Sequence, residues 1–176
     1  MSLLTMKTDT KIKLVYLLTT TALLVAMDQV TKIYVQSKFY LGESVTVIEN
    51  YFNFTYVQNP GAAFGFMARS PEVFRETFFL LIPPIAMGII IYFLKSVKAS
   101  DKIQVLALSL VFGGALGNYI DRLRVKYVID FLDFHFRHLY SWPAFNIADS
   151  AIVCGIIILF FLSFRKEEPK ESGQVA

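Results

Sequence analysis

Charged residues are scarce in this chain of 176 residues. Asp, Glu, Lys and Arg make up 18% of it, whereas hydrophobic residues make up 55%. Soluble domains usually carry about 25% charged residues, so the deficit favours a lipid environment. The net charge of +3 is small, and the basic residues lie in short clusters beside apolar runs. That pattern indicates contact with membrane lipids and argues against a nucleic-acid partner.

Cysteine is nearly absent as well. The single one, Cys154, lies inside an apolar run, and we interpret it as a small buried hydrophobic residue. One cysteine can form no internal disulfide and no cysteine metal site. HExxH, G-x-S-x-G and P-loop motifs are also missing. His135 and His138 lack an obvious third ligand and are interpreted as interfacial, so we expect no metal and no cofactor.

Four long apolar runs are present. About 20 residues cross the hydrocarbon core, and the outer two runs reach that length only if an aspartate near one end is admitted. We therefore predict an all-α membrane protein with four transmembrane helices in a single integral membrane domain, residues 1–176. The predicted helices are 14–31, 77–94, 103–120 and 147–164. The polar tail 165–176 is predicted to be disordered.

The first run could also be read as a secretory signal peptide. Lys7, Lys11 and Lys13 precede its apolar residues, as such a peptide requires. No small-residue cleavage site follows, and the chain continues instead as Asp28-Gln29-Val30-Thr31-Lys32. We therefore favour an uncleaved helix.

The extramembrane segment 32–76 is too long for a simple connector. Residues 45–48 and 52–57 have the composition of strands, and the second alternates polar with aromatic or β-branched residues. We predict a small extracytoplasmic β-sheet between helices one and two. Lys and Arg are denser in the N-terminal segment, the 95–102 loop and the tail, which places both termini in the cytoplasm.

Isolated polar residues gather at one membrane face. Successive spans alternate in direction, so the ends of helices one and three and the start of helix four share a face. A charge within a membrane is costly, which makes each such residue a functional candidate. These residues are Asp28, Lys32, Asn118, Asp121, Arg122, Asp130, Asp133, Asn146 and Asp149.

Two pairs at this face have helical spacing. Asp28 and Lys32 are four residues apart, as are Asn118 and Arg122, so each pair lies on one side of a helix. The first pair is either an interfacial ion pair or functional. Arg122 either contributes to a site or extends to lipid phosphate.

Asp130 and Asp149 are each flanked by apolar residues, which should raise their pKa values. If close together, they would share one proton, so that one activates a water and the other protonates a leaving amine. That is an aspartic protease arrangement. The alternative is that each only caps a helix, with Asp149 as an N-cap. A proton-relaying transporter and a lipid-binding scaffold also remain open.

The chain resembles the lipoprotein signal peptidase family, also called signal peptidase II, from about Leu14 to Phe164. Five blocks carry the resemblance: Asp28-Gln29-Val30-Thr31-Lys32, Asn59-Pro60-Gly61-Ala62-Ala63-Phe64-Gly65, Gly113-Gly114-Ala115-Leu116-Gly117-Asn118-Tyr119-Ile120-Asp121-Arg122, Val128-Ile129-Asp130-Phe131 and Phe145-Asn146-Ile147-Ala148-Asp149-Ser150. One departure is Ile129, where the family often has valine, and this change is conservative.

The resemblance implies an aspartic endopeptidase of the bacterial cytoplasmic membrane. Its substrates are diacylglyceryl-modified prolipoproteins, cut just before the lipidated cysteine near the extracytoplasmic face. The resemblance implies that no metal is needed, and we expect a monomer. The residue roles that it implies are catalysis by Asp130 and Asp149, substrate binding or support of the pair by Asn59, Asn118, Arg122 and Asn146, and structural support by Asp28, Lys32 and Gly114.

Overall fold

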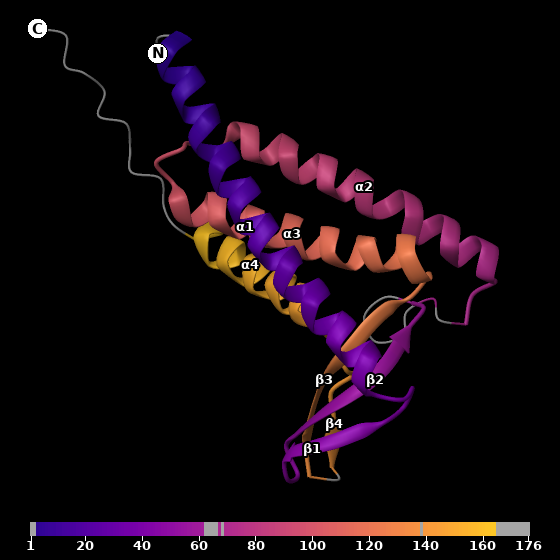
Figure 1. Ribbon diagram of the computed structural model, residues 1–176. Coiled ribbons are helices and arrows are strands. Elements are labelled where there is room, and N and C mark those ends of the chain that lie inside the picture. The colour runs from indigo at the N-terminus through magenta and orange to yellow at the C-terminus, as the bar shows by residue number, and fades with distance from the viewer. Residues whose placement is uncertain (1–2, 62–66, 68, 138, 165–176) are drawn as a thin grey trace, which may run out of the picture.

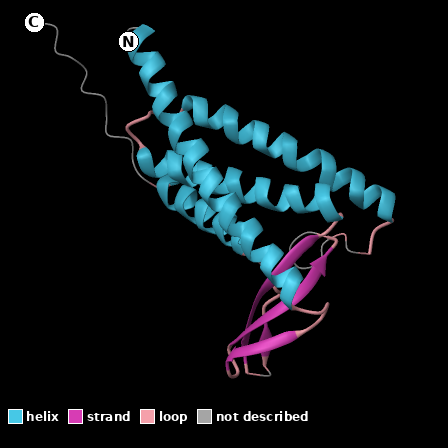
Figure 2. Ribbon diagram, viewed as in Figure 1, coloured by secondary structure: helices cyan, strands magenta, loops and turns pink. Residues whose placement is uncertain are grey.

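The computed structural model describes residues 3–61, 67, 69–137 and 139–164. Within these residues the chain forms four helices and a four-stranded antiparallel sheet (Figures 1 and 2). The helices are α1 (Leu3–Lys38), α2 (Glu72–Ser96), α3 (Lys102–Val125) and α4 (Ile147–Ser163). The strands are β1 (Ser44–Ile48), β2 (Phe52–Asn59), β3 (Val128–Phe136) and β4 (Tyr140–Ser141), in the order β1-β2-β3-β4. The predicted disordered tail, residues 62–65 of the second family block and His138 lie outside the described residues.

The helices extend further than the apolar runs that predicted them. Helix α1 has 36 residues and contains no glycine or proline, so its polar ends continue the helix on both sides of 14–31. Helix α2 continues through Pro83 and Pro84. Asp101 caps the start of α3 by accepting from the amide of Gln104, and Lys126 ends α3 in the left-handed conformation.

Three of the described helices are long and apolar enough to cross a membrane, namely α1, α2 and α3. Helix α4 is apolar but has only 17 residues. Large apolar side chains such as Leu18, Leu23 and Phe161 are exposed on the outer faces of the helices. Such faces are stable in contact with lipid and unfavourable in water. Cys154 also lies on an exposed face, so its prediction as a buried residue is wrong.

The sheet is assembled from two separate parts of the chain. Strands β1 and β2 were predicted from segment 32–76, but β3 and β4 come from the connection between α3 and α4. Strand β3 pairs with β2 in antiparallel register, with Val57 opposite Asp130 and Asn59 opposite Val128. The prediction that the sheet lies wholly between the first two helices is therefore wrong, because its central pairing joins residues about 70 positions apart.

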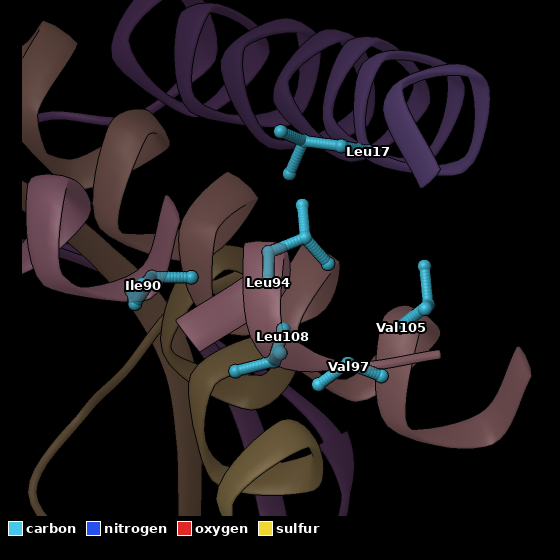
Figure 3. Close-up of a cluster of buried hydrophobic side chains, with 6 residues drawn as sticks. All are labelled: Leu17, Ile90, Leu94, Val97, Val105 and Leu108. Atoms are coloured by element: carbon cyan, nitrogen blue, oxygen red, sulfur yellow. The ribbon is translucent and has the colours of Figure 1, made fainter. Parts of the chain in front are cut away.

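The sheet lies at one end of the helical bundle (Figure 1). The C-terminal end of α1 and the N-terminal end of α4 reach this end, whereas the start of α1 and the end of α4 lie at the opposite end. A hydrophobic cluster joins α1, α2 and α3 near that opposite end (Figure 3). Its buried residues are Leu17, Ile90, Leu94, Val97, Val105 and Leu108. A second cluster, Val35, Tyr56, Ile129 and Phe131, fixes the sheet to the end of α1.

Helices α3 and α4 pack with their backbones in close approach. A Cβ atom at Gly114 would collide with the carbonyl oxygen of Ala148, and one at Gly155 would lie 2.7 Å from the carbonyl oxygen of Ala107. Only glycine permits such an approach between helices, as is common in membranes. Gly114 thereby determines where the first turn of α4 lies, and that turn carries Asp149.

Candidate functional site

Asp130 and Asp149 face a common polar centre from different elements. Asp130 lies in β3, paired to β2, and its side chain is only 2% exposed. Asp149 lies in the first turn of α4 and is partly exposed. The helix ends and the strand pairing therefore bring together two carboxylates that are 19 positions apart in the chain.

The carboxylate of Asp130 is oriented by two asparagine side chains. Asn146 Nδ2 donates to Oδ1 at 2.7 Å, and Asn59 Nδ2 donates to Oδ2 at 3.0 Å. Asn146 is completely buried, and its Nδ2 also lies 3.3 Å from the carbonyl oxygen of Ile129. Both oxygens of Asp130 therefore have fixed donors, which restricts the rotation of the carboxylate.

Asp149 is held by a capping box at the start of α4. Asn146 is the N-cap: its Oδ1 accepts from the amide of Asp149 at 2.9 Å, and its own amide donates to Asp149 Oδ2 at 3.3 Å. Asn118 Nδ2 donates to Asp149 Oδ1 at 2.7 Å. The alternative of Asp149 as the N-cap is wrong, since the helix begins at Ile147 and Asp149 is the third residue of its first turn.

The electrostatics of the two aspartates are coupled. Burial, followed by the negative charge of Asp149, raises the pKa of Asp130 from 3.8 to about 7. The hydrogen bonds from Asn59 and Asn146 and the positive charge of Lys32 act in the opposite direction but are smaller. Asp130 therefore binds a proton more readily than an exposed aspartate does, and it lies beside a second carboxylate.

Behind the aspartate pair lies a cluster of three buried charges. Lys32 Nζ lies 2.8 Å from Asp28 Oδ2 and 2.8 Å from Asp121 Oδ2, and all three side chains have 0% exposure. The pairing of Asp28 with Lys32 expected from their spacing is confirmed, and both side chains are buried within the protein. Asp121 was recognised at this face but not as a partner of Lys32, because that contact joins different helices.

Arg122, one residue after Asp121 in α3, contacts both backbone and an aromatic ring. Its Nη2 donates to the carbonyl oxygen of Gly61 at 2.8 Å, and its guanidinium lies 4.4 Å from the centre of the Phe79 ring. Among the described residues its buried Nε has no hydrogen-bond partner. The side chain is thus directed into the protein, against the alternative in which it only extends to lipid phosphate.

Gln29 contributes to this centre but was not identified from the sequence. Gln29 Nε2 donates to Asp121 Oδ1 at 2.9 Å and to the carbonyl oxygen of Gly117 at 3.2 Å. Arg124 donates to its Oε1 at 2.9 Å. The available signal was the position of Gln29 beside Asp28 in a polar block inside a spanning helix.

His135 lies apart from this centre, further along β3. Its Nδ1 lies 3.9 Å from Asp133 Oδ2. Within the described part of the chain, no group of three or more His, Cys, Asp or Glu side chains is placed to hold a metal ion.

Comparison with known proteins agrees with this architecture. The model of the signal peptidase (SPase) II family matches residues 20–165. The chain is 47% identical to the lipoprotein signal peptidase of Syntrophus aciditrophicus, over 89% of this chain and 97% of that protein. It is 46% identical to that of Maridesulfovibrio salexigens, over 81% and 90%. The chain belongs to the signal peptidase II family.

The fold of this signal peptidase II is also that of solved relatives. A bacterial membrane enzyme determined by the in meso method at 2.3 Å resolution superimposes with a TM-score of 0.75 at 33% identity, covering 88% of this chain and 94% of that one. A second such structure, at 1.9 Å, gives 0.75 at 31% identity. The chain is therefore a membrane-embedded protease, and the transporter and scaffold alternatives are set aside.

Proposed function

We propose that this chain is an aspartic endopeptidase that removes the signal peptide from diacylglyceryl-modified bacterial prolipoproteins, cutting just before the lipidated cysteine. Relatives named lipoprotein signal peptidase, one of them 47% identical, support the substrate class. The observation that carries the chemistry is that all four oxygens of Asp130 and Asp149 accept hydrogen bonds from amide donors. Burial and the nearby charge of Asp149 also raise the pKa of Asp130.

In the proposed reaction, the ionised carboxylate takes a proton from a water molecule. The water oxygen attacks the scissile carbonyl carbon, while the neutral carboxyl gives its proton to the carbonyl oxygen. A gem-diol results. Its collapse breaks the C–N bond: the carboxyl that took the proton from water gives it to the leaving nitrogen, and the other carboxylate takes a proton from a gem-diol hydroxyl. The products are a free amino group on the cysteine and a carboxylic acid on the signal peptide, which then ionises. One proton shared by Asp130 and Asp149 suffices for both steps.

The remaining site residues support this chemistry. Asn59, Asn118 and Asn146 fix the carboxylate rotamers by donating to them. Arg122 holds the residue 61 backbone near the site and can bind a substrate carbonyl, because a guanidinium offers several donors in one plane. Asp28, Lys32 and Gly114 support the packing of α1, α3 and α4 around the pair.

The proposed location is the bacterial cytoplasmic membrane, with four spans and both termini cytoplasmic. The 17 residues of α4 are about 26 Å long, slightly less than the hydrocarbon thickness of about 30 Å. Its polar first turn then lies close to the interface, which suits a substrate that is anchored in the membrane by acyl chains. The pair and the sheet lie near the extracytoplasmic face, and the enzyme acts as a monomer without a metal or cofactor.

The decisive experiment is cleavage of a lipidated prolipoprotein by the protein purified in detergent. Asp130→Asn and Asp149→Asn should each retain less than about a hundredth of wild-type activity, because one carboxyl cannot serve as both acid and base. Asp133→Asn is the matched control: it lies on the same strand, is hydrogen-bonded to Asn53, and should leave cleavage unchanged. Cleavage above about a tenth of wild type by either dyad variant would rule out the pair, and inhibition by zinc chelators would restore a metal mechanism.

A further inference from the structure

The ammonium group of Lys32 has its full complement of acceptors. An ammonium carries three N–H donors and no acceptor. Lys32 Nζ lies 2.8 Å from Asp28 Oδ2, 2.8 Å from Asp121 Oδ2 and 2.9 Å from Asn118 Oδ1. The side chain has no solvent exposure, and these three contacts are its polar partners among the residues that the structure describes.

Asp28, the first carboxylate of this cluster, also binds the backbone next to the site. Its Oδ1 accepts from the amide of Ala148 at 3.0 Å, and Ala148 immediately precedes Asp149. Its Oδ2 accepts from Gln29 Nε2 at 3.2 Å in addition to Lys32. Asp28 therefore connects the lysine to the first turn of α4.

Asp121, the second carboxylate, makes the corresponding contact with strand β3. Its Oδ2 accepts from the amide of Ile129 at 3.2 Å, and Ile129 immediately precedes Asp130. Its Oδ1 accepts from Gln29 Nε2 at 2.9 Å. The two carboxylates held by Lys32 thus each bind the peptide N–H one residue before one of the two site aspartates.

The third acceptor of Lys32 determines the direction of the Asn118 amide. Asn118 Oδ1 accepts from Lys32 at 2.9 Å and from Asn146 Nδ2 at 3.2 Å. Because an ammonium can only donate, the oxygen of Asn118 must face Lys32 and its Nδ2 must face Asp149. The positive charge of Lys32 therefore fixes the orientation in which Asn118 Nδ2 donates to Asp149 Oδ1 at 2.7 Å.

We propose that Lys32 and Asp121, with Asp28, are positioning residues for the aspartate pair. Lys32 sets the spacing of Asp28 and Asp121, which place the backbones preceding Asp149 and Asp130, and it orients the Asn118 amide. This role goes beyond general support of the packing, and it rests on the proposed function of the pair. Small displacements in such a site reduce the rate strongly, by about a hundredfold for 1 Å.

The cluster also acts on the pair through its charge. The charged groups that face the pair are Asp28 and Lys32 from α1, and Asp121 and Arg122 from α3. The positive charge of Lys32 lowers the pKa of Asp130. Loss of Lys32 should therefore raise that pKa further, whereas loss of the negative charge of Asp121 should lower it.

The test compares Lys32→Met and Asp121→Asn with Lys13→Met in the full-length detergent-purified protein. Lys13 is a matched control: it is also buried, but it donates to the carbonyl oxygens of Lys95 and Val97 at 2.9 Å each, at the end of the bundle opposite the sheet. The readouts are kcat, KM, the pH profile of kcat/KM and the melting temperature. Asp130→Asn in the same assay separates a failure of this inference from a failure of the proposed pair.

We expect kcat to fall about 30-fold or more in Lys32→Met and about tenfold in Asp121→Asn, with KM within about threefold of wild type. The alkaline limb of the pH profile should move up by about one pH unit in Lys32→Met and down in Asp121→Asn. Lys13→Met should lower the melting temperature and leave kcat and the pH profile unchanged. A merely structural role would not move the alkaline limb up in one of these variants and down in the other.

Lys32→Met leaves two carboxylates buried without their cation and can prevent folding. In that event we use the double variant Lys32→Met/Asp121→Asn, which also removes one of the two buried carboxylates. The role of Lys32 can then still be tested in a folded protein. It should fold and lose at least about 30-fold in kcat. If a folded variant that lacks Lys32 has wild-type kcat while Asp130→Asn is inactive, the positioning role of Lys32 is overturned and the proposed pair still stands. If Asp130→Asn is active, the proposed pair fails and this inference with it.

Discussion

At the scale of single residues, the properties of the site follow from donors that have fixed directions. Asn146 serves both aspartates: its side chain donates to Asp130, and it caps the helix that carries Asp149. Few polar groups are therefore sufficient to hold both carboxylates near each other inside a membrane protein. The cost is electrostatic, since burial and the charge of Asp149 raise the pKa of Asp130.

The pH dependence of cleavage follows from that pKa. Because the pKa of Asp130 is raised to about 7, the pair keeps its proton up to that pH and loses it above. We expect kcat/KM to fall about tenfold for each pH unit above about 7, since the doubly ionised pair has no proton to donate. A profile measured with a peptide substrate lacking ionisable groups checks this. Constant kcat/KM up to pH 9 would contradict it.

Arg122 should not tolerate replacement by lysine. Its guanidinium donates to the Gly61 carbonyl and lies over the Phe79 ring at the same time, and a single ammonium cannot make both contacts in the same geometry. Arg122→Lys should lower kcat/KM at least about tenfold, measured in the same cleavage assay. Lys126→Arg is a useful comparison, since among the described residues the half-exposed Lys126 side chain pairs with Glu76 at 3.6 Å and should tolerate the change. An unchanged kcat/KM in Arg122→Lys would refute a role for Arg122.

At the scale of elements, the close contact between α3 and α4 controls where Asp149 lies. Gly114→Ala would place a methyl group against the Ala148 carbonyl, one residue before Asp149. We expect a loss of stability of about 1–3 kcal/mol and a reduced kcat, because α4 must shift. Gly88→Ala in α2 is the control, since a Cβ there meets no atom within 4 Å. Thermal unfolding and cleavage rates measure both effects, and equal behaviour of the two variants would disprove this role.

The elements themselves were predictable to different degrees. Apolar runs located the helices, and alternation located the β1 and β2 residues, because both signals are local in sequence. Membership of β3 in the same sheet was not predicted, since its pairing with β2 depends on how α3 returns beside α1. The position of Asp130 next to Asn59 comes from that pairing.

The set of residues near the site could be predicted in outline, because that prediction needs only the direction of each helix. Alternating spans bring the ends of α1, α3 and α4 to one face, so the polar residues at those ends had to gather there. Which of them touch could not be derived. The contact of Asp121 with Lys32 depends on side-chain packing between α1 and α3, and the N-cap role of Asn146 depends on where α4 begins.

At the scale of the whole molecule, the proposed orientation can be tested by cysteine labelling. With Cys154 replaced by serine, a single cysteine is placed at Glu49, between β1 and β2, or at Lys98, between α2 and α3. A membrane-impermeant maleimide applied to spheroplasts should label Glu49→Cys and not Lys98→Cys. Disruption of the membrane should make both reactive. Labelling of Lys98→Cys alone in intact spheroplasts would reverse the topology.

The two-part origin of the sheet bears on when the enzyme becomes active during its synthesis. Strand β2 leaves the ribosome long before its partner β3, and Asn146 and Asp149 follow later still. Asp149, and Asn146 that donates to Asp130, are absent until the start of α4 has been synthesised. On the proposed mechanism, we therefore expect a nascent chain that ends at α3 to be inactive, because it lacks Asp149.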